Sequence, residues 1–259
     1  MQQAIEVARH AGWRAIALNR PERMNALDDA ALAALVAALA EADADPACRA
    51  LLITGSGRGF CAGADLASIS PGMDLGAHLE RTWNRVARAL HEAKMPTICA
   101  VNGVAAGAGA SVAFGCDIVL AARSARFVQA FAKVGLVPDC GGTYHLPRLI
   151  GEARARAVAM LAEPIAAETA ERWGLIWRVV DDDVLLGQAE ALAAQLALGP
   201  TQAFVLTRRA IAAATTNTLA AQLETERDLQ RQAGRTEDFA EGVRAFLEKR
   251  PARFSGRAA

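Results

Sequence analysis

The chain has 259 residues, and its 28 basic and 28 acidic side chains give a formal net charge of zero at neutral pH. This balance disfavours a nucleic-acid-binding protein and a protein held on an anionic membrane surface. Hydrophobic residues make up 53% of the chain and charged residues 22%, a composition typical of a globular protein that buries a substantial core.

The five cysteines and four histidines are scattered, without the spacing of a disulfide framework or a metal site. We therefore expect buried, reduced thiols and no bound metal. The first residues lack the apolar core and cleavage site of a signal peptide, and no later stretch predicts a membrane-spanning helix. The sequence thus predicts a cytoplasmic protein that contacts neither membrane nor nucleic acid.

The first third of the chain predicts alternating strands and helices. Residues 5–7 and 13–18 alternate in hydrophobicity around a His-Ala-Gly turn, which predicts a hairpin. Asp28 is expected to cap a helix whose leucines recur at helical spacing. Residues 50–54 predict a buried strand, and the apolar positions within residues 75–90 predict another helix.

A stretch rich in glycine and alanine follows, and the rest of the chain is interpreted around it. Residues 97–101 predict a strand that turns at Asn102 and Gly103, the small residues 105–110 are expected to open a helix, and residues 117–122 predict a second strand. This alternation indicates an α/β fold with largely parallel strands. The unpaired N–H groups of a helix N-terminus suit an oxyanion or a phosphate.

The remainder of the chain predicts mainly helices. Residues 151–180 predict two helices and a strand, and the run from Asp181 to Asp183 is expected to cap a further helix. Beyond residue 200 only helical patterns remain. We therefore predict a core over residues 1–198 and a helical region over residues 199–259 that packs on the body or on a neighbouring subunit.

Two glycine-containing turns carry the first functional signal. The sequence from Gly57 to Ala62 fits GxGxxA, but no acidic residue follows at the distance that a dinucleotide site requires. FCAGADL (60–66) and VNGVAAGAG (101–109) each place small residues just past a buried strand. Two backbone N–H groups from such turns can converge on one carbonyl oxygen, which is an oxyanion hole built from the main chain.

These motifs resemble those of the enoyl-CoA hydratase/isomerase (crotonase) superfamily. NRPERMNAL, GRGFCAGADL, AVNGVAAGAG, CDIVLAA and AFLEKRPARF occur in the order and spacing of that superfamily, over nearly the whole chain. The resemblance implies a spiral of ββα units followed by a helical trimerisation region, in a homotrimer or a hexamer made of two trimers. It also implies an acyl-CoA substrate, so that coenzyme A enters as part of the substrate and no separate cofactor is needed.

The resemblance also assigns roles to individual residues. It implies that the main-chain amides of Ala62 and Ala108 form the oxyanion hole. It further implies five residues that contact coenzyme A: Arg23, Ala64, Asp65, Leu66 and Lys249. For Arg23 and Lys249 simple hydration is the alternative, because most surface cations serve no other purpose.

The sequence departs from the hydratases of this superfamily at their two catalytic glutamates. The matching positions hold Ser111 and Phe131, whereas hydration needs an acid and a base acting on one water molecule. Asp139, in VPDCGGT, stands where several superfamily isomerases and a dehalogenase have their working aspartate. In an apolar pocket its pKa should be raised, which suits proton transfer between carbon atoms. The alternative is that Asp139 only caps the helix that begins near Gly141.

Within the superfamily, GLVPDCGGT, ERWGLIWRVVDD and EGVRAFLEKR resemble the isomerases of phenylacetate degradation. The implied activity converts ring-1,2-epoxyphenylacetyl-CoA to oxepin-CoA, with Asp139 moving the proton. A Δ3,Δ2-enoyl-CoA isomerase of fatty-acid metabolism needs the same groups and remains an alternative. A hydrolytic enzyme that forms a covalent adduct at Asp139 is less favoured, as is a noncatalytic RNA-binding or scaffold protein.

Overall fold

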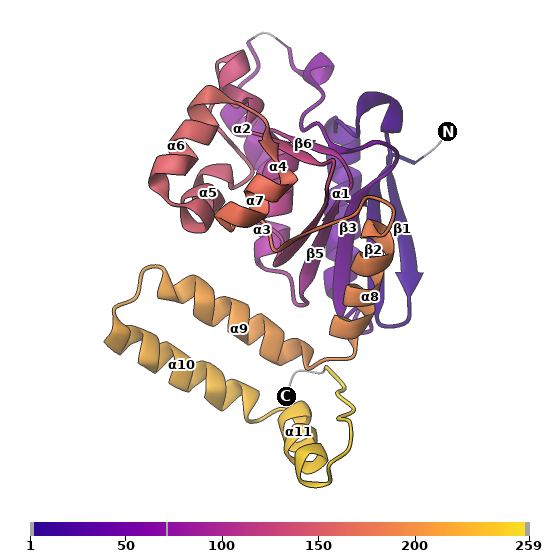
Figure 1. Ribbon diagram of the computed structural model, residues 1–259, viewed down its shortest axis with the longest axis vertical. Coiled ribbons are helices and arrows are strands. Elements are labelled where there is room, and N and C mark those ends of the chain that lie inside the picture. Colours follow the sequence, from indigo (N-terminus) through magenta and orange to yellow (C-terminus); the bar gives the residue numbers. More distant parts are fainter. Residues whose placement is uncertain (1–2, 71, 257–259) are drawn as a thin grey trace.

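The computed structural model describes residues 3–70 and 72–256 (Figure 1). A six-stranded sheet runs through its body in the order β1-β2-β3-β5-β7-β10. Its strands are β1 (Ile5–His10), β2 (Trp13–Leu18), β3 (Ala50–Gly55), β5 (Thr97–Val101), β7 (Ile118–Ala122) and β10 (Arg178–Val180). The predicted hairpin is confirmed, because β1 and β2 pair antiparallel. Every other neighbouring pair is parallel, which confirms the predicted α/β class.

A second, smaller sheet lies beside the first and has the order β4-β6-β8-β9. Its strands are β4 (Gly59–Cys61), β6 (Val104–Ala106), β8 (Arg126–Val128) and β9 (Ile165–Ala166). Because β4, β6 and β8 directly follow β3, β5 and β7, the chain repeats a strand of each sheet and then helical structure. This is the predicted spiral of ββα units. The helix predicted to open with residues 105–110 begins later, at Ala108, because β6 occupies residues 104–106.

Eleven α-helices lie within the described residues. They are α1 (Asp29–Ala44), α2 (Leu75–Arg81), α3 (Trp83–His91), α4 (Ala108–Phe114), α5 (Gly142–Ile150), α6 (Glu152–Leu161), α7 (Ala167–Trp173), α8 (Leu185–Ala197), α9 (Thr201–Ala214), α10 (Leu219–Ala233) and α11 (Glu237–Leu247). Asp28 caps α1 as predicted, by accepting the N–H of Ala31 at 2.9 Å. Helix α8 packs against β2, β3, β5 and β7 of the large sheet. In the described part of the chain, no helix combines the length and the apolar character needed to cross a membrane.

The helix predicted over residues 75–90 is divided into two. Thr82 has φ −123° and ψ −97°, so the chain bends between α2 and α3. The hydroxyl of Thr82 donates to the carbonyl oxygen of His78 at 2.7 Å, which satisfies this group at the bend. Trp83, Val86 and Leu90 are nevertheless all buried, so the apolar stripe was identified correctly although its helix is not continuous.

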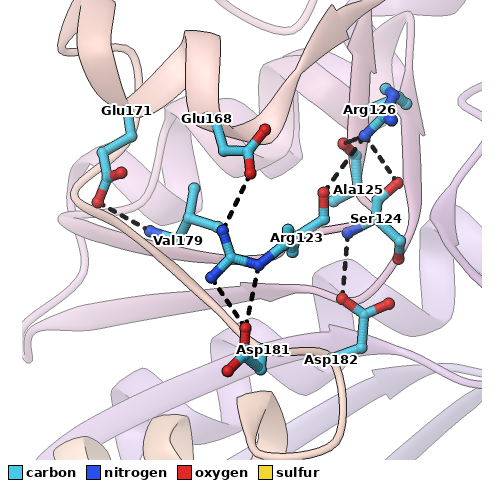
Figure 2. Close-up of polar contacts among 9 residues, drawn as sticks. All are labelled: Arg123, Ser124, Ala125, Arg126, Glu168, Glu171, Val179, Asp181 and Asp182. Atoms are coloured by element: carbon cyan, nitrogen blue, oxygen red, sulfur yellow. Dashed lines mark hydrogen bonds and ion pairs between the residues drawn. The ribbon is translucent and has the colours of Figure 1, made fainter.

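The prediction that Asp181 to Asp183 cap a helix was wrong. The residue before α8 is Val184, and no side chain caps that helix. Figure 2 shows what two of the aspartates do instead: Asp181 accepts from the guanidinium of Arg123 at 2.8 Å, and Asp182 accepts the N–H of Ser124 at 3.1 Å. Arg123 also binds Glu168 of α7. This exposed network ties the turn after β7 to α7 and to the segment after β10.

Helices α9 to α11 extend away from the body and form what we call the helical arm, residues 201–247 (Figure 1). The predicted boundary at residues 198 and 199 falls in the connection between α8 and this arm. Arg49 holds the connection in place: its guanidinium donates to the carbonyl oxygen of Gly199 at 2.5 Å and to that of Phe254 at 2.9 Å. The segments that flank the arm on both sides are thus attached to one side chain of the body.

Candidate active site

The two small-residue turns predicted to act together lie against each other. Strands β4 and β6 pair in parallel, with Cys61 opposite Ala105, so the chain leaves both strands in the same direction. Gly63 has φ +88°, and a Cβ atom added there would lie 2.8 Å from the carbonyl oxygen of Ala106 and 3.3 Å from the nitrogen of Ala108. Only glycine permits this approach, because it has no Cβ and tolerates a positive φ.

The structure corrects one of the predicted oxyanion-hole donors. The N–H of Ala62 donates to the carbonyl oxygen of Met24 at 2.9 Å, so it is not available to a ligand. In the next turn, the N–H of Leu27 donates to the carbonyl oxygen of Gly63, and the N–H of Asp65 donates to the carbonyl oxygen of Leu27. The N–H of Ala64, which lies between Gly63 and Asp65, has no acceptor among the described residues. The free N–H of the predicted turn therefore belongs to Ala64 and not to Ala62.

The second predicted donor, Ala108, is the first residue of α4. The preceding Gly107 has φ +54° and ψ −128°, a conformation that sets the direction in which the helix begins. Ala108 lies at the start of the helix, where an N–H has no partner one turn earlier, and no described residue accepts its hydrogen bond. Ala64 and Ala108 therefore present two free main-chain donors from adjacent turns.

Both donors belong to the wall of a cavity of about 260 Å³. The cavity brings together four of the predicted site residues in addition to Asp139: Ala62, Ala64, Leu66 and Ala108. Most of the other lining residues are apolar: Ile69, Leu75, Leu79, Trp83, Gly107, Ala130, Phe131, Val134, Leu136 and Val137. Among the described lining residues, the two ionisable side chains are Asp139 and His78. A cavity of this kind holds an apolar group and exposes it to very few polar atoms.

Asp139 is held in this cavity without a hydrogen-bonding partner for one of its oxygens. Its Oδ1 atom is fully buried, and the described residues provide no donor for it. Helix α5 is preceded by Gly141, with no side chain capping it, so the alternative that Asp139 is a helix cap is wrong. Burial raises the pKa of Asp139 to about 6, although a contact with its own main chain and the charge of His78 act in the opposite direction.

His78 is a cavity residue that sequence reasoning missed. Its side chain is buried, and its Nε2 atom lies 2.7 Å from Oδ1 of Asp29, the first residue of α1. This contact orients the ring and favours a proton on Nε2. A signal for it existed, since His78 lies three residues after Leu75 and therefore on the same face of α2.

The two positions where the hydratases have glutamates differ in their surroundings. Phe131 lines the cavity and places an apolar ring there. Ser111 is buried in α4, and its hydroxyl donates to the carbonyl oxygen of Gly107 at 3.4 Å. Neither residue adds an acid or a base to the cavity wall.

The remaining predicted contacts to coenzyme A lie outside the cavity wall. Asp65 accepts from Arg20 at 3.3 Å and from the N–H of Ala67 at 3.3 Å, so its carboxylate holds the loop after the cavity. Arg23 is exposed at the end of a 3₁₀ turn, Pro21–Arg23. Lys249 is exposed just after α11, which lies at the far end of the helical arm from α2 and α4 (Figure 1). The structure of one chain therefore does not bring Lys249 to the cavity.

Comparison with known proteins places this arrangement in context. A family model described as enoyl-CoA hydratase/isomerase matches residues 8–257. The 1,2-epoxyphenylacetyl-CoA isomerase of Escherichia coli K12 is 52% identical over 251 residues, which are 95% of this chain and 96% of that protein. The 2,3-dehydroadipyl-CoA hydratase of the same organism is 38% identical over 242 residues, covering 93% of this chain and 94% of the hydratase.

Solved structures give the same result for the fold. The crystal structure of an enoyl-CoA hydratase from Bacillus anthracis superposes with a TM-score of 0.90 at 31% identity, covering 98% of this chain and 100% of the other. The similar proteins thus include enzymes named as isomerases and enzymes named as hydratases, so similarity alone does not choose between these reactions.

Proposed function

This chain belongs to the enoyl-CoA hydratase/isomerase family, and we propose that it isomerises ring-1,2-epoxyphenylacetyl-CoA to oxepin-CoA. The observation that carries the proposal is Asp139, a half-buried carboxylate with one fully buried oxygen, in an apolar cavity that also includes the free amides of Ala64 and Ala108. The 52% identity to an enzyme named 1,2-epoxyphenylacetyl-CoA isomerase supports this substrate.

The two amides supply electrostatic stabilisation. The thioester carbonyl oxygen accepts hydrogen bonds from the N–H groups of Ala64 and Ala108, and both bonds strengthen as negative charge develops on that oxygen. Because the donors belong to the main chain, their positions depend on backbone geometry and not on side-chain rotamers. The α-proton of the bound thioester is acidified as a result.

Asp139 moves the proton. Its carboxylate removes the α-proton as a general base, and the resulting charge spreads from the thioester oxygen through the conjugated ring. The carbon–carbon bond shared with the epoxide opens as the ring expands, and the protonated Asp139 returns the proton to a ring carbon. No atom is gained or lost, so one acid–base group is sufficient for the overall reaction.

Water activation has little support in this cavity. Hydration requires one group to deprotonate water and another to protonate the α-carbon. With Ser111 and Phe131 at the glutamate positions, Asp139 has no carboxylate partner among the described residues of the cavity wall. This difference favours isomerisation over hydration and also keeps an activated water away from a reactive epoxide.

The substrate assignment is tested by turnover of three thioesters with the purified protein. We expect conversion of the ring epoxide with a kcat/KM at least about tenfold above that for a 3-enoyl-CoA, and hydration of crotonyl-CoA below about 1% of either rate. A 3-enoyl-CoA that reacts faster than the epoxide would establish the Δ3,Δ2-enoyl-CoA isomerase instead. Dominant hydration of crotonyl-CoA would contradict both isomerase assignments.

We also propose that the helical arm assembles the protein into a homotrimer, or into a hexamer of two trimers. Large apolar side chains are exposed along the arm, including Phe246 with 82% of its surface accessible. In an assembly, Lys249 of one copy would approach the phosphates of coenzyme A bound to another copy, with Arg23 as a second cation. Ala64 and Leu66 would contact the pantetheine and adenine portions.

Replacing Phe246 with glutamate is expected to reduce the molar mass in solution from that of an oligomer to that of one chain, because a charge in an apolar interface is not compensated. Light scattering after size-exclusion chromatography measures this. The matched control is Met160→Glu, which changes an exposed apolar residue of α6 on the body and should leave a trimer. An unchanged mass for Phe246→Glu would remove the arm from the interface.

A further inference from the structure

One residue of the cavity wall carries a buried hydrogen-bond donor that the proposed reaction does not use. Trp83 lines the cavity, and only 1% of its surface is accessible. Its indole Nε1 atom is fully buried and has no acceptor among the described residues. Buried tryptophans usually find a partner for this N–H, because leaving it unpaired is costly. An unpaired donor on a side chain of the cavity wall therefore favours an acceptor that a bound ligand supplies.

Trp83 is fixed next to the reacting region. It begins α3 immediately after the bend at Thr82, and its carbonyl oxygen accepts a contact from Sγ of Cys140 at 3.6 Å. Cys140 directly follows Asp139 in the chain. The indole and the proposed proton carrier are thus connected through neighbouring residues, although their buried polar atoms, Nε1 and Oδ1, do not bond to each other.

The other polar groups of the cavity wall already have a partner or a proposed role, or cannot donate a hydrogen bond to the acyl group. The amides of Ala64 and Ala108 suit the thioester oxygen. Asp139 accepts hydrogen bonds once it is ionised, and His78 directs Nε2 to Asp29. Among the described lining side chains, this leaves the indole N–H of Trp83 as a neutral donor that has no assigned acceptor.

We propose that the indole N–H of Trp83 donates a hydrogen bond to an oxygen atom carried by the acyl group, away from the thioester. The site would then select acyl-CoA thioesters with an ether-type or epoxide oxygen over hydrocarbon acyl groups of the same shape. This inference rests on the acyl-CoA site proposed above and specifies its substrate class further.

The test compares two unreactive ligands of nearly equal shape, 2-methoxyphenylacetyl-CoA and 2-ethylphenylacetyl-CoA, which differ by an oxygen in place of a methylene. We expect the wild-type protein to bind the methoxy compound about tenfold more tightly by calorimetry, and Trp83→Phe to abolish that preference. The control Trp177→Phe changes an exposed tryptophan and should retain it. Equal Kd values in the wild type, or a preference retained by Trp83→Phe, would overturn the proposal.

A second substitution distinguishes loss of the indole N–H from loss of the fold. Incorporation of 3-benzothienylalanine at position 83 preserves the shape of the indole and removes its N–H, so it should also abolish the preference for oxygen. Because binding is measured without turnover, the outcome is separate from the reaction assignment. An inactive protein that still prefers the methoxy ligand would refute isomerisation of the epoxide while supporting the role of Trp83.

Discussion

Replacing Asp139 with asparagine is expected to lower kcat by about 10³-fold or more, because the lining residues that the structure describes include no second carboxylate to take its place. The Kd for a phenylacetyl-CoA ligand should stay within about tenfold of wild type, since the amides of Ala64 and Ala108 still hold the thioester. Steady-state kinetics and calorimetry measure the two quantities. Turnover that survives the substitution would remove Asp139 from the mechanism.

The same residue predicts the pH dependence of the wild-type enzyme. The base must be ionised, and burial raises the pKa of Asp139 to about 6. We therefore expect kcat/KM to fall as the pH decreases through about 6 and to be independent of this group well above that value. A profile that stays flat down to pH 5 would contradict the assignment of Asp139 as the base.

Asp139→Asn should also stabilise the fold at high pH. The native pKa of about 6 lies above the ordinary value of 3.8, so ionising Asp139 destabilises the native state above pH 6 and has no such effect below about pH 4. The full increase in the pKa of Asp139 corresponds to about 3 kcal/mol of folding free energy. Because the side chain is partly exposed, we expect Asp139→Asn to gain roughly 1–2 kcal/mol of this stability. Urea denaturation at pH 8 and pH 4 should show the gain only at pH 8.

The second large effect is expected from Gly63→Ala. The added Cβ would lie 2.8 Å from the carbonyl oxygen of Ala106, so the turns that carry the Ala64 and Ala108 amides must move apart. Loss of alignment of one oxyanion donor typically lowers kcat by about 10²-fold. We expect that decrease in kcat, with no change in the pH at which kcat/KM declines, because Asp139 is untouched.

Gly174→Ala is the matched control for this substitution. Gly174 also has a positive φ, +78°, but a Cβ there would meet its nearest neighbour, the carbonyl oxygen of Leu149, at 3.7 Å, an ordinary contact. Both variants should lose about 1 kcal/mol of folding free energy from the left-handed backbone. Only Gly63→Ala should lose activity. Equal kcat values for the two variants would show that the backbone geometry at Gly63 does not contribute to catalysis.

Much of the fold could be predicted where a local pattern determines the structure. The hairpin of β1 and β2 and the cap at Asp28 depend on neighbouring residues, and both predictions are confirmed. The small sheet was missed because its strands have only two or three residues, too few for a periodicity. The cap predicted for Asp181 and Asp182 failed because Arg123 and Ser124, almost sixty residues earlier, compete for them.

In the candidate site, too, the features that depend on neighbouring residues were predicted, and those that depend on distant residues were not. The motif at residues 60–66 located one turn of the cavity, but choosing between the amides of Ala62 and Ala64 required knowledge of the Met24 carbonyl, which is distant in sequence. The position of Asp139 in an apolar cavity was anticipated. That His78 lines the cavity was not anticipated, because its orientation depends on the carboxylate of Asp29, which belongs to α1.

The guanidinium of Arg49 lies where the helical arm joins the body. It donates to the carbonyl oxygens of Gly199 and Phe254, which flank the helical arm on either side, and the next residue in the chain is the first of β3. Strand β3 leads directly to β4 and from there to Ala64. One short stretch of chain, from Arg49 through β3 and β4, therefore runs from the point where the helical arm is attached to the turn that presents the free amide of Ala64.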